Sequence, residues 1–235
     1  MAEWAARRFW KSVDVVEQPE GGFAIHLDTK PVRTPAKAPL LLPTRPLAQA
    51  VAAEWDAQVE TVAPLTMPLT RSANSALDKV APQRDEVLRL IAAYGETDLL
   101  CYRAERPAEL AQRQAAAWDP LLDWAAERHG ARLLPVQGVM PQPQPQAALE
   151  ALARPLADLS PFRVAALHDL VALSGSLVIG LAAAEAVRPA DELWDVSRLD
   201  EKWQAEQWGE DEEAARAAAV KREAFLHSDR FFRLA

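Results

Sequence analysis

At 235 residues, half of them hydrophobic, the chain is long enough to bury the core of one large domain or of two small ones. Its formal net charge of −8 argues against nucleic acid as a partner, because phosphate binding needs a basic surface. The single cysteine, Cys101, excludes an intramolecular disulfide framework and suits a reducing compartment.

The first third of the sequence predicts a small antiparallel sheet. Hydrophobic and polar residues alternate roughly over 9–16 and 23–27, glycines separate the two segments, and 32–34 is a candidate third strand. Closely spaced prolines exclude a long helix before Thr44. Thr44 is then placed to cap a helix that starts at Arg45.

Helical patterns dominate from Arg71 onward. The predicted helices are 82–94, 107–128, 146–159, a long apolar helix from 160 that ends before Pro189, and a last helix over 197–226. We therefore expect an α+β chain, in which a small β-containing N-terminal domain (1–70) precedes a mainly α-helical C-terminal domain (71–235). The composition places the boundary between residues 65 and 80.

The apolar segment 170–184 falls short of the roughly 20 residues that a bilayer requires, so we expect a buried core helix and no membrane insertion. The first ten residues contain no secretory hydrophobic region, and they are too poor in Arg and Ser for a transit peptide. A cytoplasmic location is expected.

The sequence contains no Gly-rich phosphate loop and no dinucleotide fingerprint. Its four histidines are scattered without a second ligand at metal spacing, and Cys101 reads as a small buried residue. We therefore expect no cofactor, no metal, no small-molecule substrate and no enzymatic activity. One alternative is a serine hydrolase that uses Ser174 or Ser176 with His168, and solvent access to the serines would discriminate it.

Acidity is concentrated in residues 191–213, which hold ten carboxylates and two basic groups, and Trp194, Trp203 and Trp208 lie in the same segment. Large aromatic side chains within an acidic cluster indicate a surface that meets a basic, partly apolar partner. The alternative is a solvated helix face above core tryptophans. A hard cation is not favoured, because these carboxylates lack the sharp glycine turn of a calcium loop.

Ser197 followed by Asp200 resembles a capping box at the start of the last helix. If that helix continues through Gly209, then Glu201, Ala205, Trp208 and Glu212 share one stripe, which Ala215 and Ala219 extend. A carboxylate on an apolar stripe needs a cationic partner. Glu201 and Glu212 therefore either pair with a basic residue of this chain or anchor another protein.

Several blocks together resemble the ATP synthase alpha-subunit assembly chaperones. The C-terminal blocks are Ser197-Arg198-Leu199-Asp200-Glu201, Trp203-Gln204 and Trp208-Gly209-x-x-Glu212. The others are Phe9-Trp10, Lys30-Pro31-Val32-Arg33-Thr34-Pro35, Glu54-Trp55, Met67-Pro68-Leu69-Thr70-Arg71 with Asn74, Glu96-Thr97-Asp98-Leu99-Leu100, Trp118-Asp119-Pro120-Leu121 and Ser174-Gly175-Ser176. Their collinear order spans residues 8 to 226.

This resemblance implies a non-enzymatic chaperone that binds the unassembled alpha subunit and keeps it from aggregating until the beta subunit takes it. The mitochondrial members of the family carry targeting peptides, and the first ten residues here do not fit one. The resemblance therefore also implies a bacterial, cytoplasmic member. The acidic residue important in the family falls on Glu212, with Glu213 as the adjacent alternative. The predicted partner-binding residues are therefore Glu212, Trp208, Glu201 and Glu213. A generic acidic adaptor for basic proteins is the second alternative function.

Overall fold

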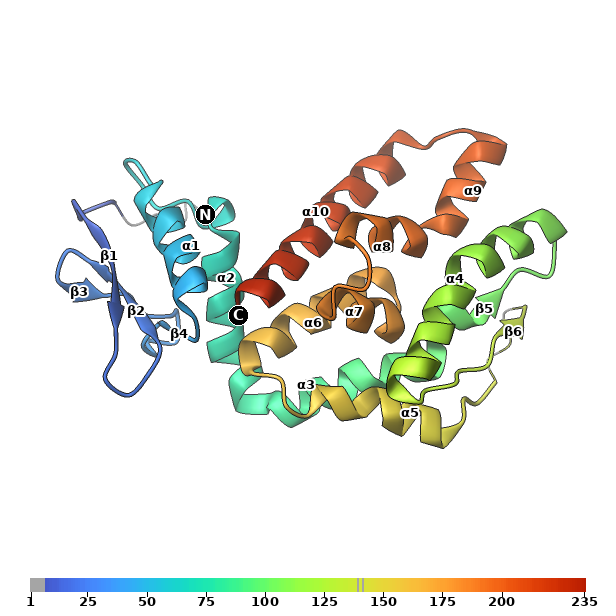
Figure 1. Ribbon diagram of the computed structural model, residues 1–235. Coiled ribbons are helices and arrows are strands. Elements are labelled where there is room, and N and C mark those ends of the chain that lie inside the picture. The colour runs from blue at the N-terminus through green and yellow to red at the C-terminus, as the bar shows by residue number, and fades with distance from the viewer. Residues whose placement is uncertain (1–6, 139, 141) are drawn as a thin grey trace. The chain divides into compact units, whose positions relative to one another are not determined.

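The computed structural model describes residues 7–138, 140 and 142–235, which form two compact units (Figure 1). The first unit holds the described residues up to Arg84 together with Ser160–Ala165 and Arg230–Ala235, and the second holds Asp85–Leu159 and Ala166–Asp229. The division between 70 and 71 stays a prediction, because compactness does not show which segment folds independently.

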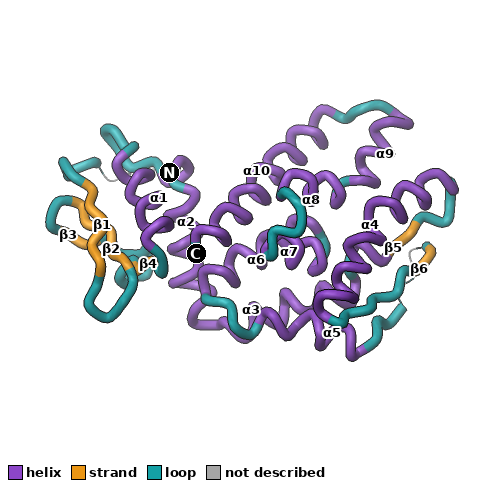
Figure 2. Tube along the Cα trace, viewed as in Figure 1, coloured by secondary structure: helices purple, strands orange, loops and turns teal. Residues whose placement is uncertain are grey.

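The first unit is built on a small sheet (Figure 2). Its strands are β1 (Val13–Glu17), β2 (Phe23–Leu27), β3 (Lys30–Pro31) and β4 (Leu41–Leu42). The second strand, β2, pairs antiparallel with the other three, and its register with β1 aligns Val13 with Leu27. The predicted antiparallel sheet is therefore confirmed, although β3 lies just before the expected third strand.

Helix α1 (Arg45–Asp56) packs against this sheet through an apolar face. Its buried residues are Leu47, Ala48, Val51 and Ala52. The Leu47 N–H donates to Thr44 Oγ1 at 3.2 Å, which confirms the predicted cap. Helix α2 (Pro68–Ser75) follows, and the carboxylate of Glu54 accepts the N–H groups of its first turn.

The second unit consists mainly of helices. They are α3 (Arg84–Ala93), α4 (Ala108–His129), α5 (Gln146–Ala153), α6 (Pro161–Ser174), α7 (Leu177–Ala184), α8 (Ala190–Ser197), α9 (Leu199–Trp208) and α10 (Glu212–Leu234). Arg84 and the two short segments 160–165 and 230–235 are counted with the first unit. A parallel strand pair, β5 (Tyr102–Arg103) and β6 (Val136–Gln137), completes the second unit. A small sheet region followed by mostly helical chain confirms the α+β class.

Helix α7 lies in the core of the second unit, with every residue from 177 to 183 buried. Gly180 allows a close approach to helix α6, since a Cβ there would lie 2.4 Å from Val171 Cγ2. The buried carboxylate of Asp98 accepts the N–H groups of Leu100 and Val178, each at 3.0 Å. Among the helices of the described residues, none has the length and apolar content to span a bilayer.

The long apolar helix predicted from residue 160 is interrupted, which corrects the sequence expectation. Gly175 adopts a φ of 75°, and Ser176 caps a new helix by accepting the Ile179 N–H at 3.0 Å. Ser174 and Ser176 are both fully buried, so they lack the solvent access that a hydrolase nucleophile needs. His168 bonds its sequence neighbour Asp169 at 3.0 Å. The hydrolase hypothesis loses its basis.

The single last helix predicted over 197–226 is also wrong, because three helices, α8 to α10, occupy this segment. Ser197 ends α8 and donates to the Trp194 carbonyl at 2.7 Å, so it does not form the expected capping box. Gly209 ends α9 with φ 91° and ψ 160°, a conformation that is reserved essentially for glycine. The chain therefore turns between Trp208 and Glu212.

Candidate functional site

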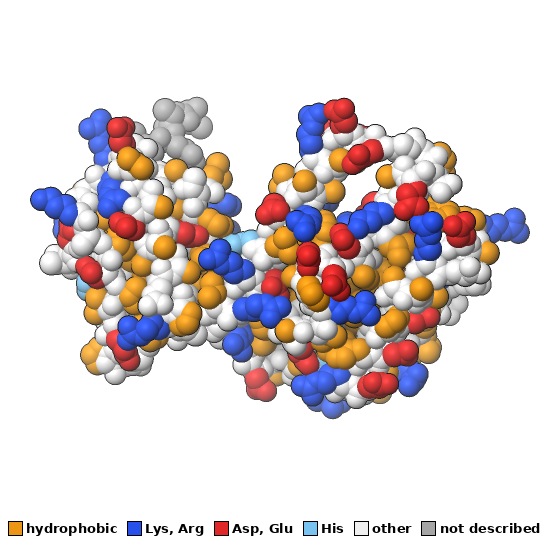
Figure 3. All heavy atoms as spheres, turned by 45° about the horizontal axis from the view of Figure 1, so that its top comes forward, with side chains coloured by type: hydrophobic (Ala, Val, Ile, Leu, Met, Phe, Trp, Pro, Cys, Tyr) orange, Lys and Arg blue, Asp and Glu red, His pale blue; other side chains and the backbone are white. Residues whose placement is uncertain are grey.

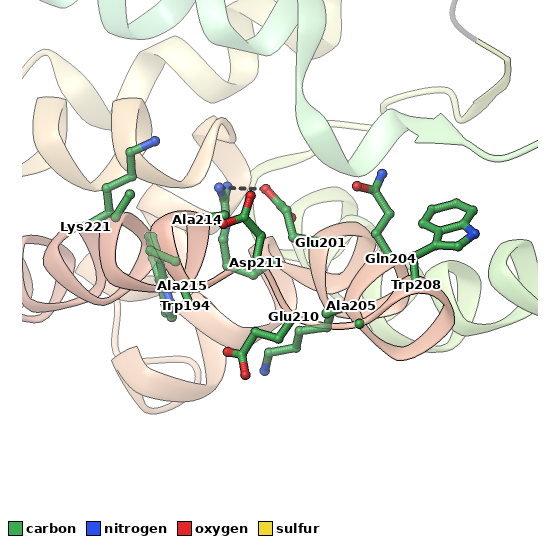
Figure 4. Close-up of a pocket in the computed structure, with 15 residues that line it drawn as sticks. Trp194, Glu201, Gln204, Ala205, Trp208, Glu210, Asp211, Ala214, Ala215 and Lys221 are labelled. Atoms are coloured by element: carbon green, nitrogen blue, oxygen red, sulfur yellow. Dashed lines mark hydrogen bonds and ion pairs between the residues drawn. The ribbon is translucent and has the colours of Figure 1, made fainter.

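A groove of about 650 Å³ lies between α9 and the first half of α10 (Figure 4). We call it the α9–α10 groove. Its lining residues are Trp194, Arg198, Glu201, Lys202, Gln204, Ala205, Trp208, Gly209, Glu210, Asp211, Ala214, Ala215, Ala217, Ala218 and Lys221. All of them belong to the second unit. In the space-filling view, the surface of the helical unit is hollowed and carries interspersed acidic and basic side chains (Figure 3).

The first wall of the groove is set by how α9 is attached to α4. Trp203 is buried, and the guanidinium of Arg113 lies 4.5 Å from its ring centroid. Arg113 also donates to Glu206 at 2.6 Å, and Gln114 donates to Asp200 at 2.8 Å. These contacts fix one face of α9 on α4.

The other face of α9 is left for the groove. Glu201, Gln204, Ala205 and Trp208 follow one another at helical spacings of three, one and three residues, so they form one stripe. Trp208 is the largest apolar side chain of that stripe, and it remains 78% exposed. An indole this exposed is a candidate anchor for a partner, because large aromatic residues dominate the energetics of interfaces.

The tryptophan at the base of the groove is rigidly held. Trp194 is 3% exposed, and its ring lies 5.7 Å from that of Phe225. The guanidinium of Arg198 lies 5.0 Å from the Trp194 ring centroid and donates to the Ser174 carbonyl at 3.2 Å. Arg198 also donates to Glu201 at 3.0 Å, which fixes this end of the α9 stripe.

The second wall is the N-terminal part of α10. Asp211 caps this helix, because its carboxylate accepts the N–H groups of Glu213 at 2.8 Å and Ala214 at 3.3 Å. The helix then runs through alanines, and every residue from 211 to 221 is exposed or only half-buried. The first fully buried side chain of α10 is Phe225. Three turns of an alanine-rich helix therefore present apolar surface beside the groove.

Two of the four predicted partner-binding residues line this groove. Trp208 and Glu201 belong to the α9 stripe, as the sequence spacing predicts. The sequence left open whether Glu201 pairs within the chain. Its carboxylate does form an ion pair with Arg198, but its side chain remains 59% exposed. Figure 4 shows Glu201 and Trp208 on the same helix, with Lys221 of α10 toward the opposite end.

Glu212 and Glu213 do not line the groove, although in the sequence they lie between the lining residues Asp211 and Ala214. The stripe that was expected to join Trp208 to Glu212 depends on a continuous helix, and Gly209 interrupts it. Glu212 instead forms an ion pair with Arg216 at 2.8 Å, with the two side chains 86% and 78% exposed respectively. An exposed pair at this spacing contributes about 0.3–0.5 kcal/mol, so it does not hold the fold together.

Of the α10 alanines that line the groove, the sequence spacing named only Ala215, and the other three are the part of the site that it missed. Ala214, Ala217 and Ala218 resemble ordinary good helix formers, and only the exposure of this helix makes them a candidate surface. The groove lining itself is electrically balanced, with three acidic and three basic side chains. The surplus of negative charge in segment 191–213 is therefore carried by residues outside the lining.

Comparison with known proteins gives a consistent result. The model of the family described as ATP12 chaperone protein matches residues 7–126. The crystal structure of Atp12 from Paracoccus denitrificans is 51% identical, covers 99% of both chains and superposes with a TM-score of 0.96. The D202K mutant of that protein gives the same values. The structure of Atu1473 from Agrobacterium tumefaciens is 46% identical over 95% of this chain and 85% of that one, with a TM-score of 0.89.

Proposed function

Because the chain belongs to the ATP12 chaperone family, the chaperones of ATP synthase assembly, we propose that it binds the unassembled alpha subunit of the F-type enzyme. In this proposal the chaperone prevents aggregation of the alpha subunit until the beta subunit takes the chaperone's place on it. The protein itself has no catalytic activity in this proposal.

The observation that carries the proposal is the α9–α10 groove, whose alanine wall and exposed Trp208 present apolar surface that the described chain leaves accessible. An unassembled subunit exposes an apolar interface patch that promotes aggregation. A chaperone has to cover such a patch without preventing its later release. The α10 wall consists mainly of alanines, which offer little contact area per residue, and this favours release.

The charge around the groove gives the contact its selectivity. Residues 191–213 hold eight more acidic than basic groups, which equals the net charge of the whole chain. A partner with a basic surface is steered toward this region, whereas acidic proteins are repelled. We assign Trp208 as the apolar anchor, Glu201 as a contact within the groove, and Glu212 and Glu213 as charges at its rim.

The test is the aggregation of purified alpha subunit, followed by light scattering at increasing chaperone concentration. We expect the wild type to suppress aggregation and Trp208→Ala to suppress it less. Phe9→Ala is the matched control, because Phe9 is an aromatic residue of the other unit that is 62% exposed. The proposal fails if the wild type gives no protection. The assignment of Trp208 fails if both variants protect like the wild type.

The acidic segment also supports a second candidate function, that of a general adaptor for basic proteins. Binding to an unrelated basic protein such as lysozyme, measured over a range of salt concentrations, separates the two. A chaperone for one client binds the alpha subunit far more tightly than lysozyme at 0.15 M salt. Equal binding, with the same salt dependence, supports the adaptor.

A further inference from the structure

We propose that the α9–α10 groove receives one amphipathic α-helix of the client, with a basic side chain at the end near Glu210 and an acidic one toward Lys221. The identity of the client as the alpha subunit rests on the proposed function. The helical form and the charge order rest on the groove alone.

A helical occupant follows from the walls of the groove. Apart from Gly209, Glu210 and Asp211, every lining residue lies in a helix or directly beside one. Helical backbone groups bond one another, so these walls provide no strand edge to pair with an extended segment. A client strand buried here would leave its own N–H and C=O groups without partners, whereas a client helix satisfies them internally.

The composition of the α10 wall permits close contact with such a helix. Ala214, Ala215 and Ala218 lie on the groove side, and none of them extends beyond Cβ. Short side chains allow two helix axes to approach to about 8 Å, the lower end of the range for packed helices. Trp194 beneath them and Trp208 at the other wall provide the larger contact surfaces.

The charge order follows from which lining residues already have partners. Arg198 pairs with Glu201 at 3.0 Å, and Lys202 pairs with Asp195 at 2.9 Å. Asp211 is occupied as the helix cap. Within the part of the chain that the structure describes, Glu210 and Lys221 have no ion-pair partner, and neither is buried.

These two unpaired charges set a direction along the groove. Lys221 is ten residues beyond Asp211 on α10, which corresponds to about 15 Å of helix. An occupying helix of about the same length places one end near each charge. A base near Glu210 and an acid near Lys221 then form complementary pairs at the two ends.

A second copy of this chain is a weaker candidate for the occupant. Its own α10 carries both charge signs, but each copy would bring the acidic segment 191–213 to the shared interface. Like charges facing each other across an interface oppose association. A basic client removes this repulsion.

The first experiment places a photo-crosslinking amino acid, p-benzoylphenylalanine, at Ala215, which lines the groove, and separately at Ala219, which is exposed on the same helix but does not line it. Each full-length variant is irradiated with purified alpha subunit, and the crosslinks are mapped by mass spectrometry. We expect the Ala215 crosslinks to fall in one helical segment of the alpha subunit at spacings of three and four residues. Crosslinks at alternate residues, in several separate segments, or between two chaperone chains overturn the inference.

The second experiment fills the groove. Ala215→Trp should raise the Kd for the alpha subunit about tenfold or more, while Ala219→Trp should leave it unchanged, provided that both variants melt like the wild type. Glu210→Lys and Lys221→Glu should each raise the Kd about two- to fivefold at low salt. If the wild type binds and protects the alpha subunit but the two tryptophan variants behave alike, the groove inference fails while the proposed function stands. If the wild type itself does not bind, the proposed function fails first.

Discussion

Replacing Glu212 by lysine tests whether this carboxylate acts on the client or within the fold. The substitution breaks the exposed ion pair with Arg216, which is worth about 0.3–0.5 kcal/mol. It also exchanges a favourable acid for a base in the first turn of α10, at a cost of about 0.3–1 kcal/mol. The introduced lysine also repels Arg216 by about as much as the ion pair contributed, so we expect the free energy of unfolding to fall by about 1–2 kcal/mol.

The effect on the client should depend on salt. A charge at the rim acts mainly through steering, so we expect the affinity for the alpha subunit to fall by about 1 kcal/mol, roughly fivefold, at low ionic strength. The loss should become smaller near 0.5 M salt, where charges are screened over a few ångströms. The assay measures chemical denaturation, and aggregation of the alpha subunit, on the same variant.

Glu213→Lys is the control for this experiment. Glu213 lies in the same helical turn, so the change in helix-end electrostatics is the same, but the Arg216 pair remains intact. A loss of stability of about 3–5 kcal/mol in Glu212→Lys would mean that Glu212 is a buried structural partner, contrary to its exposure. Normal stability together with normal protection at low salt would remove Glu212 from the client surface.

Three further predictions concern the fold. Leu177→Asp should place an unpaired charge in the core and lower the free energy of unfolding by several kcal/mol, seen as a large drop in melting temperature; an unchanged melting point would show that α7 is not the core. Gly209→Ala should cost about 1–3 kcal/mol, because alanine does not adopt φ 91° and ψ 160° readily, and a Gly130→Ala control at φ 75° should cost less. Burial raises the pKa of Asp98 to about 6, above its ordinary value of 3.8, so the folded protein binds this proton more tightly than the unfolded chain does. The resulting contribution to the free energy of unfolding is complete below pH 3.8 and is lost as the pH rises through 6. The stability of the wild type relative to Asp98→Asn, measured by denaturation at each pH, should therefore rise from pH 7 to pH 4, and a constant difference would contradict this reasoning.

Local patterns predicted those parts of the fold that local chemistry determines. The alternation over 23–27 and the glycine turn before it specify a hairpin, and the structure confirms the antiparallel pair. Thr44 caps α1, and the helix predicted over 107–128 is present as α4, Ala108–His129. The ordered blocks also predicted the family correctly.

The helix interruptions could not be predicted in the same way. Gly175 and Gly209 both lie within patterns that fit a continuous helix, and a glycine inside a helix costs only about 1 kcal/mol relative to alanine. Whether the chain continues or turns depends on tertiary contacts. At Gly175 the turn is stabilised by the Ser176 cap and by Asp98, which lies far away in the sequence and bonds the Val178 N–H.

The lining of the α9–α10 groove could be predicted in part for the same reason. Trp208 and Glu201 share the groove because both lie in the unbroken part of α9, where helical spacing holds, and their role in binding a partner stays a prediction. Glu212 was assigned to the same stripe because the turn at Gly209 was not foreseen. The alanines of α10 carry no signal of their own, because alanine suits a buried or an exposed helix equally.

Under the proposed function, the groove and the acidic segment meet different requirements of a temporary contact. We expect selectivity to come from the charge of segment 191–213, which accelerates the encounter and adds little to the lifetime of the complex. The lining provides one exposed tryptophan and a wall of alanines, so its buried area, and with it the affinity, stays limited. We therefore expect a client bound in this way to associate quickly and still to be transferred to a partner with a larger interface, since differences in affinity between related complexes lie mostly in the dissociation rate.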